Sequence, residues 1–167
     1  MGAKGGRIVA NNADIVRMLN DDLTGEVEAT LVYMHSHFVV TGHCPTQMEM
    51  FDIALDEMRH IEWLAEAIVG LGGEPELTPR KVRYASSDPV EATRRGVELE
   101  QEAIDQYNAH IAAIPDPKIQ RLLAHIRDEE VDHLDEFREL VEEAEGPQDR
   151  KPTVGDMTGT PQGSESE

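Results

Sequence analysis

Two short motifs in this sequence place a glutamate and a histidine on the same face of a helix. Glu57 and His60 form one Glu-x-x-His pair, and Glu130 and His133 form the other. Residues three apart are neighbours on a helical surface, so each pair can offer a carboxylate and an imidazole to one ligand. One such pair would mean little in a chain with 34 Asp and Glu residues. Its repetition indicates a duplicated site.

Each half of the chain also carries a glutamate and a tyrosine upstream of its motif. Glu26 lies seven residues before Tyr33, and Glu100 lies seven residues before Tyr107. From this glutamate to the motif glutamate the interval is 31 residues in the first half (26 to 57) and 30 in the second (100 to 130). Apolar neighbours at helical spacing put both glutamates on inward faces. The sequence therefore predicts two equivalent half-sites.

Four carboxylates and two imidazoles form a ligand set that suits two divalent irons. Two Fe(II) ions bring four positive charges, which four carboxylates neutralise. Hard oxygen ligands with one imidazole per metal favour iron or manganese. Without metal, four glutamates facing a bundle core would repel one another and lose their hydration, so we expect some to be protonated. A purely structural role for the whole set is therefore costly.

Other polar residues near these motifs have plainer interpretations. Tyr33 and Tyr107 are either core aromatics or groups that hydrogen-bond the ligands and take part in electron transfer. Histidines on or near the inward stripes are interpreted as core or surface residues and not as further ligands: His37, His110 and His125. Acidic residues off the apolar stripes are predicted to lie on solvated faces: Glu28, Glu98, Glu102 and Glu129.

Composition narrows the class of protein. The chain has 167 residues, enough for one domain with a sizeable core, and 34 acidic against 15 basic residues give a net charge of −19. Such a charge disfavours nucleic-acid and anionic-membrane partners and favours cations. A single cysteine, Cys44, excludes an internal disulfide. With no long apolar run, we expect a soluble, cytoplasmic protein.

Caps and breakers divide the chain into four long helices. The first is predicted from about 12–14 to Gly42, and the second from about 45–46 to 72–73. Asp88 caps the third, which runs to about Ile114, and Asp116 caps the fourth, which ends at Gly146. Short first and third connections with a long middle one predict an all-α, antiparallel four-helix bundle. Its second and third helices run parallel and are joined by a long crossover.

Three segments follow from this division. Residues 1–11 are predicted to be a flexible N-terminus, and residues 12–145 the four-helix bundle. Residues 146–167 are rich in Gly, Ser, Thr and Pro with few large apolar side chains, so we predict a disordered acidic tail.

At these residues the chain resembles the ferritin-like superfamily of carboxylate-bridged di-iron proteins, and bacterioferritin most closely, over about residues 8–145. The segments that carry the resemblance are LNDDLTGEVEA, ALDEMRHIEWLAEAIVGLGGEPEL and IRDEEVDHLDEF. It implies two irons per bundle, with Glu57 and Glu130 as the bridging pair. The implied activity is that of a ferroxidase, which oxidises Fe(II) with dioxygen or peroxide for iron storage and detoxification. The implied metal ligands are Glu26, Glu57, His60, Glu100, Glu130 and His133, with Tyr33 beside them.

Two departures from relatives keep alternatives open. Rubrerythrins, which reduce peroxide, resemble this bundle but add a four-cysteine module and a carboxylate one turn along the third helix, where this chain has Ala103. A rubrerythrin-like peroxide reductase with a separate electron donor is therefore the alternative enzyme. A helical bundle that only binds metal is the non-enzymatic alternative. Ferritin cages also have a fifth helix, and nothing after Gly146 could form one.

Met58 and the tail suggest partners. Met58 points outward from the second helix, at the place where bacterioferritin binds haem b across a dimer interface. It predicts a homodimer or higher oligomer, with or without haem. The peptide Thr153–Gly159 weakly resembles the peptides that dock ferritin-like cargo in encapsulin shells, but departs at Asp156 and Met157. An encapsulin partner would place the protein inside a nanocompartment.

Overall fold

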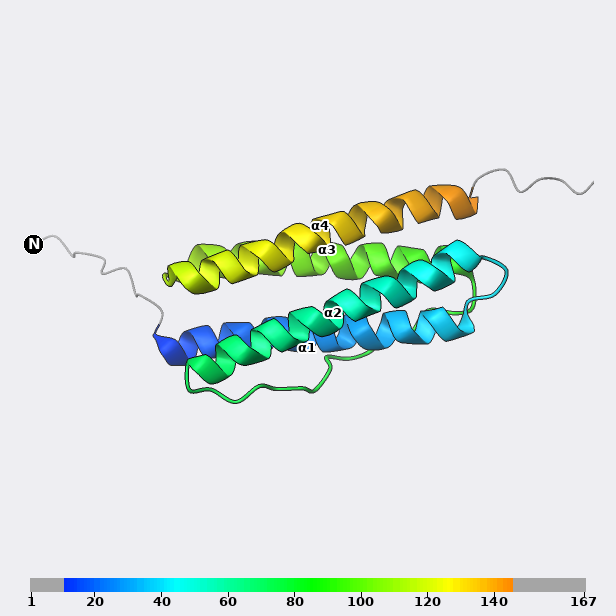
Figure 1. Cartoon of the computed structure of the whole chain (residues 1–167). Helices are drawn as coiled ribbons and strands as arrows, with labels where there is room; N and C mark the ends of the chain where they lie inside the picture. The colour runs from blue at the N-terminus through cyan, green and yellow to red at the C-terminus, as the bar shows by residue number, and fades with distance from the viewer. Residues whose placement is uncertain (1–10, 146–167) are drawn as a thin grey trace, which may run out of the picture.

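The computed structural model describes residues 11–145, which form a bundle of four long helices (Figure 1). These are α1 (Asn12–Val39), α2 (Cys44–Gly70), α3 (Pro89–Ala113) and α4 (Pro117–Glu145). The predicted all-α, four-helix fold is confirmed, and helix ends agree with the predicted ones to within a few residues. Residues 1–10 and 146–167, the rest of the predicted N-terminal segment and the predicted tail, lie outside the described residues, whereas Asn11 is the cap of α1.

Side-chain caps start each helix. Asn11 begins α1 with a capping box, and its Oδ1 accepts from the Asp14 backbone N–H at 3.0 Å. Asp88 caps α3 and Asp116 caps α4, as predicted from the prolines that follow them. The cap of α2 is His43, whose Nδ1 faces the backbone N–H of the first turn. A histidine cap was not predicted, because histidine is not among the usual capping residues.

The helices pack as two antiparallel pairs, α1 with α2 and α3 with α4, and the pairs face each other (Figure 1). Residues 71–88 form the crossover, which returns along α1 so that α2 and α3 run parallel. Asn20 fastens it to α1: its Nδ2 donates to the Glu74 carbonyl at 3.0 Å, and its Oδ1 accepts from the Glu76 backbone N–H at 2.8 Å.

The interior consists of two apolar clusters with a polar layer between them. One cluster includes Val32, Met50 and Phe137, and the other includes Leu19 and Leu64. Gly96 lets α3 approach α4, since a Cβ there would lie 2.8 Å from the Phe137 ring. The clusters seal the polar layer from water at both ends. None of the four described helices has the length and apolarity needed to cross a membrane.

Candidate metal centre

All four helices contribute to the polar layer. Side chains from every helix point into it, each between 0 and 5% exposed: Glu26 from α1, Glu57 and His60 from α2, Glu100 from α3, and Glu130 and His133 from α4. These are the six residues that the duplicated motif singles out. The long crossover makes this possible, because it brings the second half of the chain against the first with both inward faces opposed.

The six side chains form two overlapping groups of four. Glu26, Glu57, His60 and Glu130 each offer one ligand atom, and these atoms lie within 4.8 Å of one another. The second group, with the same spacing, pairs Glu57 and Glu130 with the remaining glutamate and histidine. The two motif glutamates therefore belong to both groups, which is the arrangement that a pair of bridging carboxylates requires.

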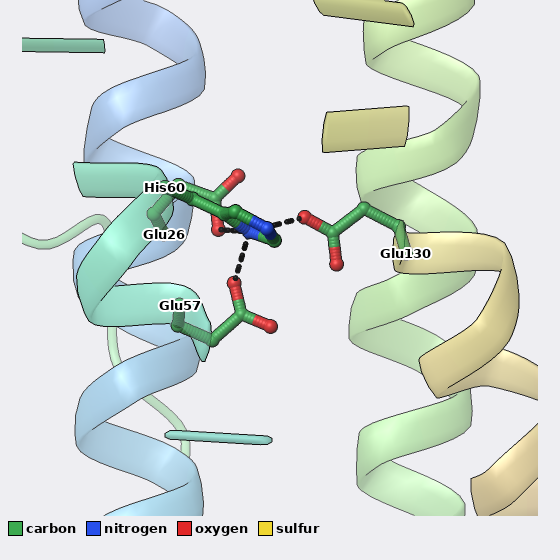
Figure 2. Close-up of side chains that lie close together, drawn as sticks. All are labelled: Glu26, Glu57, His60 and Glu130. Carbon is green, nitrogen blue, oxygen red and sulfur yellow. Dashed lines mark hydrogen bonds and ion pairs between the residues drawn. The ribbon is translucent and has the colours of Figure 1, made fainter. Parts of the chain in front are cut away.

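Each histidine turns its Nδ1 toward the carboxylates. His60 Nδ1 lies 3.0 Å from Glu130 Oε1, 3.3 Å from Glu57 Oε2 and 3.5 Å from Glu26 Oε2 (Figure 2). His133 Nδ1 lies 3.3 Å from Glu57 Oε1 and 3.2 Å from Glu130 Oε2. The Oε1 atoms of Glu57 and Glu130 are buried and accept no hydrogen bond. Carboxylate oxygens that face imidazole nitrogens without a hydrogen bond between them fit cations held in the same place.

The outer nitrogen of each histidine meets an acid from the opposite motif. His60 Nε2 lies 2.8 Å from Glu129 Oε2, and His133 Nε2 lies 3.6 Å from Asp56 Oδ2. Glu129 directly precedes Glu130, and Asp56 directly precedes the other motif glutamate. Glu129, predicted to lie on a solvated face, is 34% exposed and also makes this contact with a candidate ligand. The repeated acidic residue before each Glu-x-x-His could have revealed both contacts, which fix ring orientation and make imidazoles better ligands.

Each of the two tyrosines hydrogen-bonds a candidate glutamate from the other half of the chain. Tyr33 donates a hydrogen bond to the Glu100 carboxylate, and Tyr107 donates one to Glu26. Both rings are fully buried, and Tyr33 packs on Phe137 with ring centroids 5.2 Å apart. Each tyrosine is therefore both a core aromatic and a hydrogen-bond partner of a candidate ligand, while a part in electron transfer stays a prediction.

The remaining acids separate into two kinds. Glu98 and Glu102 are exposed, as predicted. Glu28 is not: it is 7% exposed and accepts a hydrogen bond at 3.0 Å from Arg95, itself largely buried. The prediction of a solvated Glu28 is wrong, because Arg95 comes from α3 and the pattern of α1 alone gives no sign of it.

Met58 points away from the centre and is 53% exposed.

Burial and mutual repulsion control the protonation of the carboxylates. Burial, together with the charge of Glu26, raises the pKa of Glu57 to about 8. Burial and the charges of neighbouring glutamates also raise the pKa values of Glu100 and Glu130. Burial would raise the pKa of Glu26 as well, but hydrogen bonds from Glu57 and His60 lower it to about 2. The predicted protonation of the metal-free cluster follows from these shifts.

Comparison with known proteins agrees with this geometry. A family model described as the ferritin-like domain matches residues 16–146. The chain belongs to the ferritin-like family. A bacterioferritin from Desulfovibrio desulfuricans is 30% identical over 136 residues, which cover 77% of this chain and 74% of that protein. The sequence-based resemblance to bacterioferritin is thereby confirmed.

Three solved structures share the fold. The Bacteroides fragilis bacterioferritin-related protein, a dodecameric thioferritin, has a TM-score of 0.73 at 25% identity, covering 80% of this chain and 87% of its own. The D. desulfuricans bacterioferritin, whose diiron site was studied in several catalytic states, has 0.72 at 27%, covering 78% and 79%. A ferritin-like diiron-carboxylate protein from Bacillus anthracis has 0.70 at 27%, covering 78% and 96%.

The raised pKa values predict how pH affects the metal-free protein. Between pH 4.5, the ordinary pKa of glutamate, and about 8, folded Glu57 keeps a proton that the unfolded chain has lost. The raised imidazole pKa values act in the same direction above pH 6.5. The free energy of unfolding should therefore fall as pH rises. We expect the chelator-treated protein to melt about 5 °C or more lower at pH 8 than at pH 5.5 in thermal circular dichroism.

Glu57→Gln is the matched control for this effect, because it keeps the shape of the side chain and removes its titration. Its melting temperature should fall less over the same pH interval. An unchanged or rising melting temperature in the unmodified protein would show that the cluster does not hold these protons.

Proposed function

We propose that this protein is a di-iron ferroxidase, which oxidises Fe(II) with dioxygen or peroxide for iron storage or detoxification. The observation that carries the proposal is the pair of buried carboxylates, Glu57 and Glu130, common to two groups of four ligand atoms. Each metal would also be held by one further carboxylate and one imidazole. Glu26 and His60 would hold one metal, and Glu100 and His133 the other. Relatives whose structures contain a diiron site support the choice of iron.

Bound as a pair, the irons supply two electrons to one oxidant. With dioxygen the balance is two Fe(II), one O2 and two protons giving two Fe(III) and one hydrogen peroxide. The protein contributes charge balance and protons. Four ionised carboxylates neutralise two Fe(II), so the proton that Glu57 holds without metal leaves as the metal binds. Hydrogen bonds from the two tyrosines then hold the terminal carboxylates in place.

No contact among residues 11–145 favours the alternative of a rubrerythrin-like peroxide reductase. The position where those proteins carry an extra carboxylate is Ala103, and its methyl group lines a cavity beside the centre. A bundle that only binds metal is separated from a ferroxidase by turnover, which the first experiment below measures.

We also propose that the protein forms a homo-oligomer through α2. Apolar side chains on α2, at least 36% exposed, recur at intervals of three and four residues: Met48, Phe51, Leu55 and Met58. Leu31 and Phe38 on the neighbouring α1 are exposed too. Such a stripe suits packing against the same stripe of a second copy. A related structure is dodecameric, which supports assembly. Haem binding at Met58 stays a prediction.

The docking role of the tail stays a prediction, and residues 146–167 lie outside the described residues. If Val154 and Met157 dock in an encapsulin shell, the bundle would supply the oxidation and the shell the mineral cavity. Co-purification with a co-expressed shell protein, before and after deletion of residues 151–167, decides this question.

Removing a bridging carboxylate should stop turnover. We expect Glu57→Ala and Glu130→Ala to slow initial Fe(II) oxidation about 100-fold or more, because each change removes a ligand from both metals. Oxygen uptake and ferric absorbance after mixing with two Fe(II) per chain give the rate. Glu139→Ala is the control, since that glutamate is exposed on α4, lies in neither group of ligand residues and should leave the rate unchanged. Equal rates in all three variants would contradict the assignment.

Glu129 should act through His60. Glu129→Ala removes the acceptor at 2.8 Å from His60 Nε2, so the ring loses its fixed orientation. We expect metal affinity, measured by competition with a chelator, to fall about 10- to 100-fold. Asp132→Ala, an exposed acid three residues further along α4, should change affinity little. Equal affinities in the two variants would mean that the Glu129 contact has no role in binding.

The proposed interface can be tested without touching the metal centre. Leu55→Glu places a charge in the middle of the exposed stripe on α2, so we expect the oligomer to dissociate in light scattering. Leu77→Glu makes the same change at an exposed apolar residue of the crossover and should leave assembly intact. A monomeric unmodified protein, or an unaffected Leu55→Glu variant, would exclude this interface.

A further inference from the structure

A narrow cavity connects the carboxylates to the outside between α1 and α3. Its inner wall includes the four candidate glutamate ligands, and its outer wall reaches the exposed Glu102. Residues with small side chains leave space between the two helices: Gly25 and Ala29 on α1, and Ala103 on α3. The cavity volume is about 30 Å³, room for about one or two water molecules.

Arg80 of the crossover closes the outer side of this cavity. Its Nη2 donates to the Asp21 carbonyl of α1 at 2.5 Å and to Gln106 Oε1 of α3 at 2.6 Å. The guanidinium thus spans both helices. It lies directly over Gly25, where a Cβ would already be 3.5 Å from it. The side chain stays 34% exposed, so solvent reaches it.

Further into the cavity than Arg80, Asp22 has a carboxylate oxygen without a hydrogen-bond partner. Asp22 is 2% exposed and lines the same cavity. Its Oδ1 lies 2.7 Å from both Gln106 Nε2 and His110 Nδ1, whereas its Oδ2 is buried and accepts no hydrogen bond. An unpaired buried carboxylate oxygen is costly unless something cationic comes to it.

We propose that Fe(II) reaches the metal centre through this cavity, with Arg80 as the residue that closes the passage and Asp22 as the first internal carboxylate that the ion meets. The proposal rests on the proposed function, since it names the route by which the substrate arrives. An ion with six waters would need about 180 Å³, far more than the cavity offers. The ion must therefore exchange water for protein oxygens on the way, and Asp22 Oδ2 is free to accept it.

Arg80 acts on this passage in two ways. Its guanidinium fills the opening, and its positive charge repels an approaching cation. It is not among the ligand atoms of either group of four, so it affects how fast the metal arrives and not how much binds at equilibrium. Arg83 of the same crossover provides the comparison. It carries the same charge, pairs with Glu98 at the surface and is absent from the cavity wall.

Binding of Co(II) to metal-free protein, followed by stopped-flow absorbance, separates arrival from oxidation. We expect Arg80→Ala to bind Co(II) about threefold faster or more than the unmodified protein, and Arg83→Ala to match the unmodified rate. Ala103→Leu, which fills the passage, and Asp22→Asn, which removes the carboxylate, should both slow binding. The number of Co(II) bound per chain should stay at two in every variant that folds.

The outcomes distinguish this proposal from the proposed function. Two Co(II) per chain with equal rates in Arg80→Ala and Arg83→Ala would overturn the passage and leave the metal centre standing. A faster reaction with dioxygen in Arg80→Ala, without faster Co(II) binding, would show that the cavity admits the oxidant and not the cation. Failure of the unmodified protein to bind Co(II) would overturn both proposals.

Discussion

Four carboxylates and two imidazoles buried in the middle of an apolar bundle are the constraint on which this structure depends. Moving one ionised carboxylate out of water carries an effective cost on the order of several kcal/mol. The protein lowers that cost by sharing charge and protons among the residues of the layer. The layer lies between two clusters of buried apolar side chains that hold the helices together. A pair of divalent cations would neutralise the same charges directly.

Most contacts in the layer cross between the two halves of the chain. Tyr33 of α1 hydrogen-bonds the candidate glutamate of α3, and Tyr107 of α3 hydrogen-bonds that of α1. Glu129 of α4 contacts the candidate histidine of α2. Neither half can complete its own site. The crossover that brings the halves together is therefore a functional part of the fold, and through Arg80 it also contacts the edge of the centre.

The sequence predicts the helices and the six central residues because both depend on local periodicity. Caps such as Asp88 and Asp116 lie directly before prolines, and motif spacing identifies inward faces without knowledge of neighbours. Glu28 and Glu129 show where this reasoning ends. Both lie off the apolar stripe of their own helix, yet each pairs with a residue of a different helix. Contacts of this kind depend on packing between helices, which periodicity does not report.

The most direct test of the central claim is anomalous diffraction at the iron edge from crystals soaked with Fe(II) under anaerobic conditions. The account predicts two iron peaks per chain, with Glu57 and Glu130 each contacting both. One histidine should bind each iron through Nδ1. A single peak, or peaks away from the buried layer, would contradict it.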